Sequence, residues 1–391
     1  MADEQPQGWT PPDWFKKYLW HLLSVLLFMA ATAGSTWVFI KLGVQPVPVP
    51  APPVAQDGGP VVASDAGTEF VPATGWVPDP DAVDAAVAAQ QIPDFKDTPA
   101  GKAVQGDDDV FLWRAVRKVN NRGPPWYPNV NQRDVGSCVG CGNKHSVDVL
   151  QAVQIEQGDW IEFKPVSAET IYAFSRVEVG GGRIRGDGSV NAWAFEAGKR
   201  FGNLPMEGDL AEYSADRARA WGRTGVPDNR EAKAREHIVK DGAKVTSAEE
   251  AARAIRQGYP IPVASSRGFR MQRDRDGFCS PGGTWMHCLA IIGVRGGARP
   301  GFFILNSWGD QAHGGPVWPE DAPVAGFWAD WSVVDSMLRQ GDSFALSGVA
   351  GFPARKLDWL VKAPRPNPFG DRDATARRLD APGAGLLGLA W

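Results

Sequence analysis

One stretch of the chain, residues 131–155, strongly limits what the rest can fold into. It reads NQRDVGSCVGCGNKHSVDVLQAVQI, a loop that ends at Gly136-Ser137 followed by apolar residues at helical spacing from Val139 onward. This pattern predicts a helix that begins at Cys138. The positive end of a helix dipole lowers the pKa of a nearby thiol, and the thiolate is the nucleophilic form of cysteine. Cys138 is therefore the candidate nucleophile.

A thiol nucleophile needs a partner base, and the chain has only five histidines. His287 is followed by the apolar run 288–294, which predicts a buried strand with the histidine held at its start. The next predicted strand, 302–305, leads into Asn306-Ser-Trp308-Gly. The Asn306 side chain can accept the imidazole N–H and orient the ring, while Trp308 can shield that hydrogen bond from water.

Together these motifs resemble those of the papain (C1) family of cysteine peptidases. In that family a Gln precedes the nucleophile by six positions, the nucleophile follows Gly-Ser, the His opens a strand, and the Asn begins Asn-Ser-Trp-Gly. Gln132, Cys138, His287 and Asn306 match these four positions. The spacing from Cys138 to His287 falls within the roughly 130–150 residues expected in papain-like enzymes.

The resemblance implies a fold and further roles. The fold would be α+β and two-lobed, with Cys138 on a helical lobe and His287 and Asn306 on a β-barrel-like lobe. Gln132 and the Cys138 backbone N–H would bind the developing oxyanion. Six residues are implied to bind the substrate: Gly188, Ser189, Ala264, Trp285, Met286 and Trp308. The first two would act through their backbone, and Ala264, Trp285 and Met286 would line a pocket for apolar side chains.

Two positions depart from the family pattern. Val139 stands where the family usually has an aromatic residue after the nucleophile, and Val135 stands where it commonly has a cysteine. The disulfide usually found near the nucleophile is therefore not predicted. A bond between Cys279 and Cys288 is left open.

A second interpretation starts from the C-x-x-C spacing of Cys138 and Cys141, which also suits a redox pair or a metal site. His145 would share their helix face. No second C-x-x-C is present, and the catalytic interpretation explains more residues. We therefore favour Cys141 and His145 as core residues, and predict neither a metal nor a cofactor.

Residues 18–40 read YLWHLLSVLLFMAATAGSTWVFI and carry no charged side chain. At ~1.5 Å per residue, a helix of this length crosses a ~30 Å hydrocarbon layer. Lys16 and Lys17 precede the run and Lys41 follows it, which favours the N-terminus inside and the catalytic domain on the extracytoplasmic side. The alternative is a signal peptide cleaved after Ala31-Thr-Ala33, with a secreted product.

Composition supports one large folded domain with appendages. Apolar residues make up 43% of the 391, and 45 Gly and 32 Pro indicate many loops and a linker. The net charge of −4 and the lack of a long basic run argue against a nucleic-acid partner. The predicted parts are a tail at 1–17, a transmembrane anchor or signal peptide at 18–42, a Pro/Ala-rich linker at 43–109, a papain-like domain at 110–355 and a C-terminal tail at 356–391.

The sequence thus predicts a single-pass membrane-anchored cysteine peptidase. Its partners would be peptide or protein substrates, and the membrane through residues 18–40. Two alternatives stay open: a papain-fold surface or virion component that binds with little proteolysis, and a related acyl-transfer enzyme acting on cell-wall peptides. Asn306 favours the peptidase, because such acyl-transfer enzymes usually have Asp or a second His as the third residue.

Overall fold

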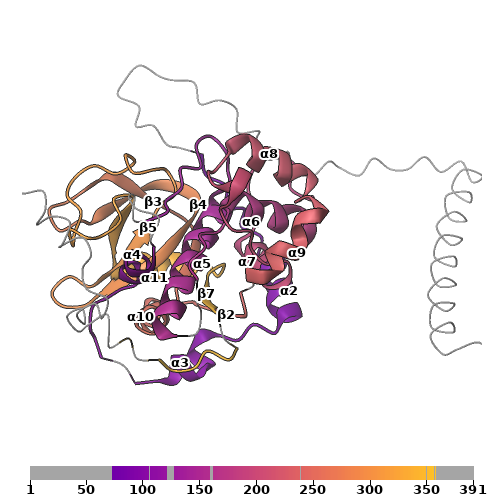
Figure 1. Ribbon diagram of the computed structural model, residues 1–391. Helices are drawn as coiled ribbons and strands as arrows, with labels where there is room; N and C mark the ends of the chain where they lie inside the picture. The colour runs from indigo at the N-terminus through magenta and orange to yellow at the C-terminus, as the bar shows by residue number, and fades with distance from the viewer. Residues whose placement is uncertain are drawn as a thin grey trace, which may run out of the picture. The chain divides into compact units, whose positions relative to one another are not determined.

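The computed structural model describes residues 73–104, 106–120, 127–158, 162–237, 239–348, 350–355 and 357. Over these residues the chain is α+β, as predicted. In Figure 1 helix α5 (Cys138–Gln157) lies between a group of helices on one side and most of the β-strands on the other. The predicted anchor at 18–42 falls outside the described residues. None of the helices inside them is both long enough and apolar enough to cross a membrane.

The other α-helices of the described residues are mostly short, and several begin at a capping side chain. Ser247 caps α10 by accepting a hydrogen bond from Glu250 N at 3.2 Å. The helices are α2 (Pro80–Gln90), α3 (Pro99–Lys102), α4 (Trp113–Val119), α6 (Ala168–Phe174), α7 (Asn191–Arg200), α8 (Ala215–Thr224), α9 (Glu231–Ala234), α10 (Ala248–Arg256) and α11 (Trp331–Leu338). Single turns of other helix types are η1 (Phe95–Asp97), η2 (Ser175–Val179), η3 (Gly208–Leu210), η4 (Asp228–Arg230) and η5 (Arg235–His237).

The larger sheet is antiparallel and is organised around its longest strand, β4 (Cys279–Arg295). β5 (Gly301–Leu305) pairs with one edge of β4, and β6 (Gly326–Asp330) pairs with β5. The other edge of β4 pairs with β3 (Ile261–Arg273) and, near its end, with β1 (Val110–Phe111). A separate two-stranded sheet joins β2 (Asp241–Lys244) to β7 (Phe344–Ser347).

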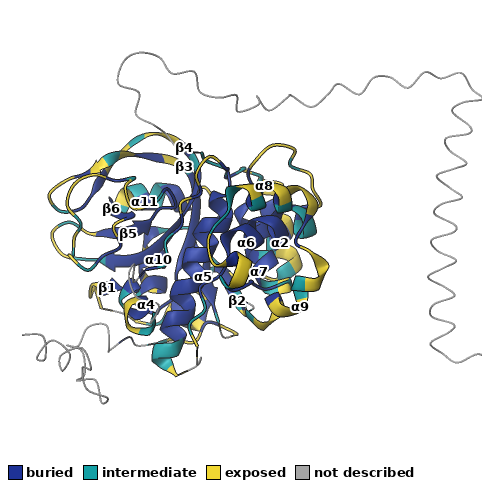
Figure 2. Cartoon of the chain, turned by 45° about the horizontal axis from the view of Figure 1, so that its top comes forward, coloured by how far each residue is buried: buried dark blue, intermediate teal, exposed yellow. Residues whose placement is uncertain are grey.

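Helix α5 is the central element of the fold. Every residue from Cys138 to Gln154 is buried, as the dark blue ribbon in Figure 2 shows. Close packing needs small residues here: a Cβ placed on Gly142 would lie 2.9 Å from Cys288 Sγ on β4. The helix also buries an ion pair between Lys144 and Asp148, both fully inaccessible. Removing one partner of such a pair typically costs about 3–5 kcal/mol. Lys144 also donates to Pro128 O at 2.7 Å and Asp148 accepts from Val166 N at 2.9 Å, so polar as well as apolar contacts hold the helix in place.

The Pro/Ala-rich linker predicted at 43–109 differs from the structure over its last part. From residue 73 onward the chain packs onto the domain and forms α2, η1 and α3. Trp76, Val83 and Phe95 are buried, which accounts for the ordered path. Proline and alanine therefore serve here as the first residues and the buried face of short helices rather than as spacers.

The local predictions around the remaining motifs mostly agree with the structure. α5 begins at Cys138, and residues 302–305 form most of β5. His287, in contrast, lies within β4 rather than at its start, because β4 extends back to Cys279 by pairing with β3. All four cysteines are free, so Cys279 and Cys288 do not pair with each other.

Candidate active site

Cys138 lies at the first turn of α5 and faces β4. Its side chain is fully buried. The backbone N–H groups of Cys288, on β4, and of Gly75 interact with the sulfur. Cys288 directly follows His287, so the thiol lies against the part of β4 that carries the candidate base.

The His287 ring is held by two contacts. Its Nε2 donates to Asn306 Oδ1 at 2.9 Å, and its ring stacks on Trp308 with centroids 4.6 Å apart and planes inclined by 26°. Its other nitrogen, Nδ1, is buried and has no hydrogen-bond partner among the described residues. The arrangement leaves Nδ1 as the nitrogen with a free lone pair, which is what a base needs.

Gln132 ties the loop before Cys138 to the loop that contains Asn306. Its backbone N donates to Ser307 O at 2.8 Å, and its Oε1 accepts from Ser307 Oγ at 2.6 Å. Gly309 completes this junction in a left-handed conformation (φ 83°), with no room for a Cβ beside Asn131. These contacts join the two loops. The side-chain N–H₂ of Gln132 donates to Val135 O at 2.9 Å and has a second N–H to donate to another acceptor.

The residues before α2 occupy the site. Gln132 Nε2 donates to the carbonyl oxygen of Ala73 at 2.8 Å, and Trp308 Nε1 donates to the same oxygen at 3.2 Å. Gly75 N and Trp76 N both donate to Met286 O, at 2.9 and 2.8 Å. The group of this segment that faces the Cys138 thiol is the Gly75 N–H. The side-chain donors Gln132 Nε2 and Trp308 Nε1 are already hydrogen-bonded to the segment.

The same segment pairs with Ser189. Ser189 N donates to Gly75 O at 2.8 Å, and Val77 N donates to Ser189 O at 2.9 Å, as in a short β-bridge. The backbone of Ser189 therefore binds an extended peptide, which is the kind of contact predicted for it. Here the bound peptide is a part of the chain itself. We call residues 73–77 the covering segment.

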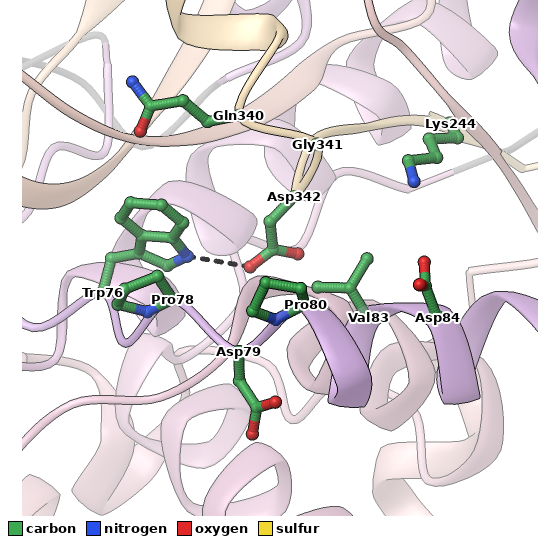
Figure 3. Close-up of a pocket in the computed structure, with 10 residues that line it drawn as sticks. All are labelled: Trp76, Pro78, Asp79, Pro80, Val83, Asp84, Lys244, Gln340, Gly341 and Asp342. Atoms are coloured by element: carbon green, nitrogen blue, oxygen red, sulfur yellow. Dashed lines mark hydrogen bonds between the residues drawn. The ribbon is translucent and has the colours of Figure 1, made fainter.

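Trp76 anchors the covering segment at a second point. Its indole Nε1 donates to Asp342 Oδ2 at 2.8 Å, and Figure 3 shows the indole nitrogen directed at that carboxylate. A small cavity of about 120 Å³ remains beside this contact, between α2 and the 340–342 loop. Asp342 also accepts from the first two backbone N–H groups of α7, and burial raises the pKa of its carboxyl to about 6.

The charge state of the thiol differs from the one that its helix position suggested. Burial raises the pKa of Cys138 to about 12, although neighbouring backbone N–H groups act in the opposite direction. Burial also lowers the pKa of His287 to about 4, against a smaller opposing effect of the bond to Asn306. Desolvation outweighs the helix dipole because the covering segment lies against the sulfur. At neutral pH both groups are uncharged in this state.

The predicted substrate-binding residues fall into three positions. Gly188 and Ser189 form the loop beside the covering segment, and Gly188 N donates to Tyr172 OH. Ala264 packs in the same apolar cluster as Cys138 and Trp76, with Met286 at its edge. Trp285 instead packs on the rings of Trp308 and His287 and belongs to the core of the sheet.

Several residues that shape the site were not predicted from the sequence. Arg176 is buried and donates to the carbonyls of Ile184, Gly186 and Gly188, so it holds the loop that ends at Ser189. Asp342 and His313 are also buried. The one sequence signal that pointed to the covering segment was Trp76, an aromatic residue within a Pro-rich stretch.

Comparisons with known proteins found no matching family model and no matching curated protein. Similar solved structures include xylellain, a cysteine protease from Xylella fastidiosa, with 15% identity and a TM-score of 0.45 over 72% of this chain and 96% of that one. Digestive procathepsin L 3 from Tenebrio molitor has 13% identity and a TM-score of 0.44, over 68% and 79%. Bromelain from Ananas comosus, bound to the inhibitor E64, has 16% identity and a TM-score of 0.37, over 61% and 98%.

These three neighbours are papain-like cysteine proteases, the family that the sequence motifs resemble. Their identities lie below 25% and their TM-scores below 0.5.

Because residues 73–77 cover Cys138, the stability of their contacts should determine how fast the thiol reacts with a reagent in solution. Replacing Trp76 by Phe removes the hydrogen bond to Asp342 and keeps an aromatic ring. A hydrogen bond to a charged acceptor is worth about 1.5–3 kcal/mol, so the uncovered state should gain about tenfold to a hundredfold in population. Alkylation of Cys138 by iodoacetamide, followed by mass spectrometry, should accelerate by that factor. Trp221→Phe is the matched control, and equal rates in both variants would show that Trp76 does not hold the segment.

Burial of the neutral His287 ring predicts a pH dependence of stability. The ring titrates near 6.5 when unfolded and near 4 when folded, so the unfolded chain binds more protons between these values. The stability is fully present above about pH 6.5, and up to about 3 kcal/mol is lost as the pH falls to about 4. Urea unfolding at several pH values measures this loss. His287→Gln should flatten the slope without abolishing it, because burial also lowers the pKa of His145 and His313. An unchanged slope would contradict the assignment.

Proposed function

We propose that this chain is a cysteine peptidase that hydrolyses peptide bonds through Cys138, His287 and Asn306, with Gln132 as an oxyanion donor. The observation that carries the proposal is the orientation of His287. Its Nε2 is bonded to Asn306, and its Nδ1 is free on the strand that contacts Cys138. An imidazole held in this way can take the thiol proton and return it to a leaving amine.

The proposed reaction is acyl transfer through a thioester. The Cys138 sulfur attacks the carbonyl carbon of the peptide, while its proton passes to His287 Nδ1. The carbonyl oxygen becomes an oxyanion that Gln132 Nε2 and the Cys138 backbone N–H can stabilise. The C–N bond then breaks as His287 protonates the amine. Water, with His287 as base, attacks the thioester, releases the acid and restores the thiol.

The contacts of the covering segment support a peptide as the substrate. It is an extended peptide, and it uses the backbone groups of Ser189 and Met286 together with the side-chain donors of Gln132 and Trp308. A substrate would need the same groups, so the covered state is a resting state. Displacing the segment would also let water reach the thiol and imidazole and so favour their charged forms.

The proposal predicts that Cys138→Ala abolishes both peptide hydrolysis and labelling by an epoxide thiol probe. The full chain should hydrolyse peptide substrates and carry the label on Cys138 alone among its four cysteines. Cys138 lies against the strand that carries the free Nδ1 of His287, whereas His313, the imidazole next to Cys279, is bonded to Asn306 through Nε2. Cys141→Ala is the matched control and should keep both activities. Labelling of Cys138 with no turnover of any peptide would instead favour a papain-fold binding component. Turnover of cell-wall fragments alone would favour the related acyl-transfer enzyme.

We further propose that residues 18–40 anchor the enzyme in a membrane, with the catalytic domain on the extracytoplasmic side. The uncharged 23-letter run and the lysines at its ends support this, and the Pro-rich stretch that follows would hold the domain away from the bilayer. The competing possibility is a signal peptide removed after Ala33.

Fractionation of cells that express the full chain distinguishes these two cases. The anchored form predicts that the probe-labelled protein stays with membranes after an alkaline wash and retains residues 1–33 by mass. Deleting residues 1–42 should move the labelled protein into the soluble fraction. A soluble full-length product whose mass begins at Gly34 would contradict the anchor and identify a secreted enzyme.

A further inference from the structure

A second histidine lies behind the candidate base, on the far side of Asn306. Asn306 Nδ2 donates to His313 Nε2 at 3.0 Å, while Asn306 Oδ1 accepts from His287 Nε2 and from Ser307 N at 2.9 and 2.8 Å. All four residues are buried. The single amide therefore connects two imidazole rings, and each ring meets a different end of it.

These contacts determine the orientation of the Asn306 amide, that is, the positions of its Nδ2 and Oδ1 atoms. With Nδ2 toward His313 and Oδ1 toward Ser307 N and His287, every polar atom of the amide has a partner of the right kind. The flipped amide would place Nδ2 against the Ser307 N–H, and would offer His287 a donor instead of an acceptor. His287 would then have to carry its proton on Nδ1, where it has no lone pair left to accept the thiol proton.

His313 can accept from Asn306 only while it is neutral and protonated on Nδ1. The structure favours this form. Nδ1 lies 3.7 Å from Cys279 Sγ, which can accept its proton, and the ring also interacts with the Met271 backbone. Arg273 Nη1 donates to the His313 carbonyl oxygen at 3.0 Å, and this guanidinium disfavours a second positive charge nearby. Burial is the largest cause of a His313 pKa near 3, and Arg273 and His287 add to it.

From this geometry we propose that His313 is a positioning residue for the reaction. It accepts from Asn306 Nδ2, sets the orientation of that amide, and so keeps the proton of His287 on Nε2 and the lone pair on Nδ1. It touches neither the substrate nor the thiol. The inference rests on the proposed function, since it assigns the support of the same base.

The test compares two amide replacements of equal chemistry and different reach. In His313→Gln the side-chain oxygen can take the place of Nε2 and still accept from Asn306. In His313→Asn the oxygen can reach only the place of Nδ1, and Asn306 Nδ2 loses its acceptor. A buried donor without a partner has a free-energy cost. If this cost raises the transition state relative to the bound substrate, the rate falls by about tenfold to a hundredfold. We expect this loss in kcat for His313→Asn, an unchanged KM, and a rate near wild type for His313→Gln.

Two further readouts separate positioning from a purely structural role. The pH profile of Cys138 alkylation should move toward that of an isolated thiol in His313→Asn and stay in place in His313→Gln. Nitrogen NMR of the histidine rings in the full chain should show His313 Nε2 without a proton at pH 7. The kinetic variants are made in the full chain, with and without Trp76→Phe, so that slow uncovering of Cys138 does not hide the effect.

Each outcome decides the matter. A proton on His313 Nε2, equal kcat in the two variants, or a loss in His313→Asn that follows its melting temperature with no change of pH profile would overturn the inference. If Cys138→Ala leaves hydrolysis intact, the proposed function fails instead. Failure of the His313 tests with a working Cys138 leaves the proposed function standing.

Discussion

The packing of helix α5 against strand β4 is the constraint on which the rest of the site depends. Gly142 lets the two elements approach until Cys288 Sγ lies where a Cβ would be, and this contact sets the distance between the first turn of the helix and the strand that carries His287. The buried Lys144–Asp148 pair also ties the helix to its neighbours, because Lys144 Nζ donates to Pro128 O at 2.7 Å and Asp148 Oδ1 accepts from Val166 N at 2.9 Å. Rotation of the helix would take these partners away from two buried charges. Cys138 is thus positioned by contacts one to three turns away from it.

The same close packing explains why the described state is uncharged. A thiolate and an imidazolium stabilise each other only if solvent or fixed dipoles repay their desolvation. Cys138 and His287 are both buried, and Gly75 covers the thiol. Backbone N–H groups favour the charged form of Cys138 and the Asn306 amide favours that of His287, but the desolvation cost is larger in both cases. The described state therefore combines an oriented His287 ring with an uncharged Cys138 thiol. In the proposed enzyme, uncovering the site would change the charge state of the thiol and leave the orientation of the ring as it is.

The sequence predicted the parts of the site that depend on local pattern. A helix start at Cys138 follows from a Gly-Ser loop and helical apolar spacing, and the pairing of His287 with Asn306 follows from two adjacent apolar strands. The covering segment has no such pattern: apart from the Trp76 indole, its bonds are made by backbone groups, and all reach residues more than fifty positions away. Asp342 and His313 sit in loops, where burial depends on what the rest of the chain places above them. Their roles therefore become visible only in three dimensions.

Access to the Cys138 thiol and orientation of the His287 ring depend largely on different residues in this fold. Access to the thiol depends on residues 73–77, which are fixed by Trp308 and Gln132 at one end and by Asp342 at the other. Orientation of the His287 ring depends on the amide of Asn306, whose other partners are Ser307 N and His313 Nε2. Trp308 and Gln132 contribute to both. The Trp308 ring stacks on His287 while its N–H donates to Ala73 O, and Gln132 donates to the same oxygen while its Oε1 accepts from Ser307 Oγ. A peptide that replaces the covering segment would take over the Trp308 N–H, so its binding would directly affect the side chain that stacks on His287, the ring to which we assign the proton transfer.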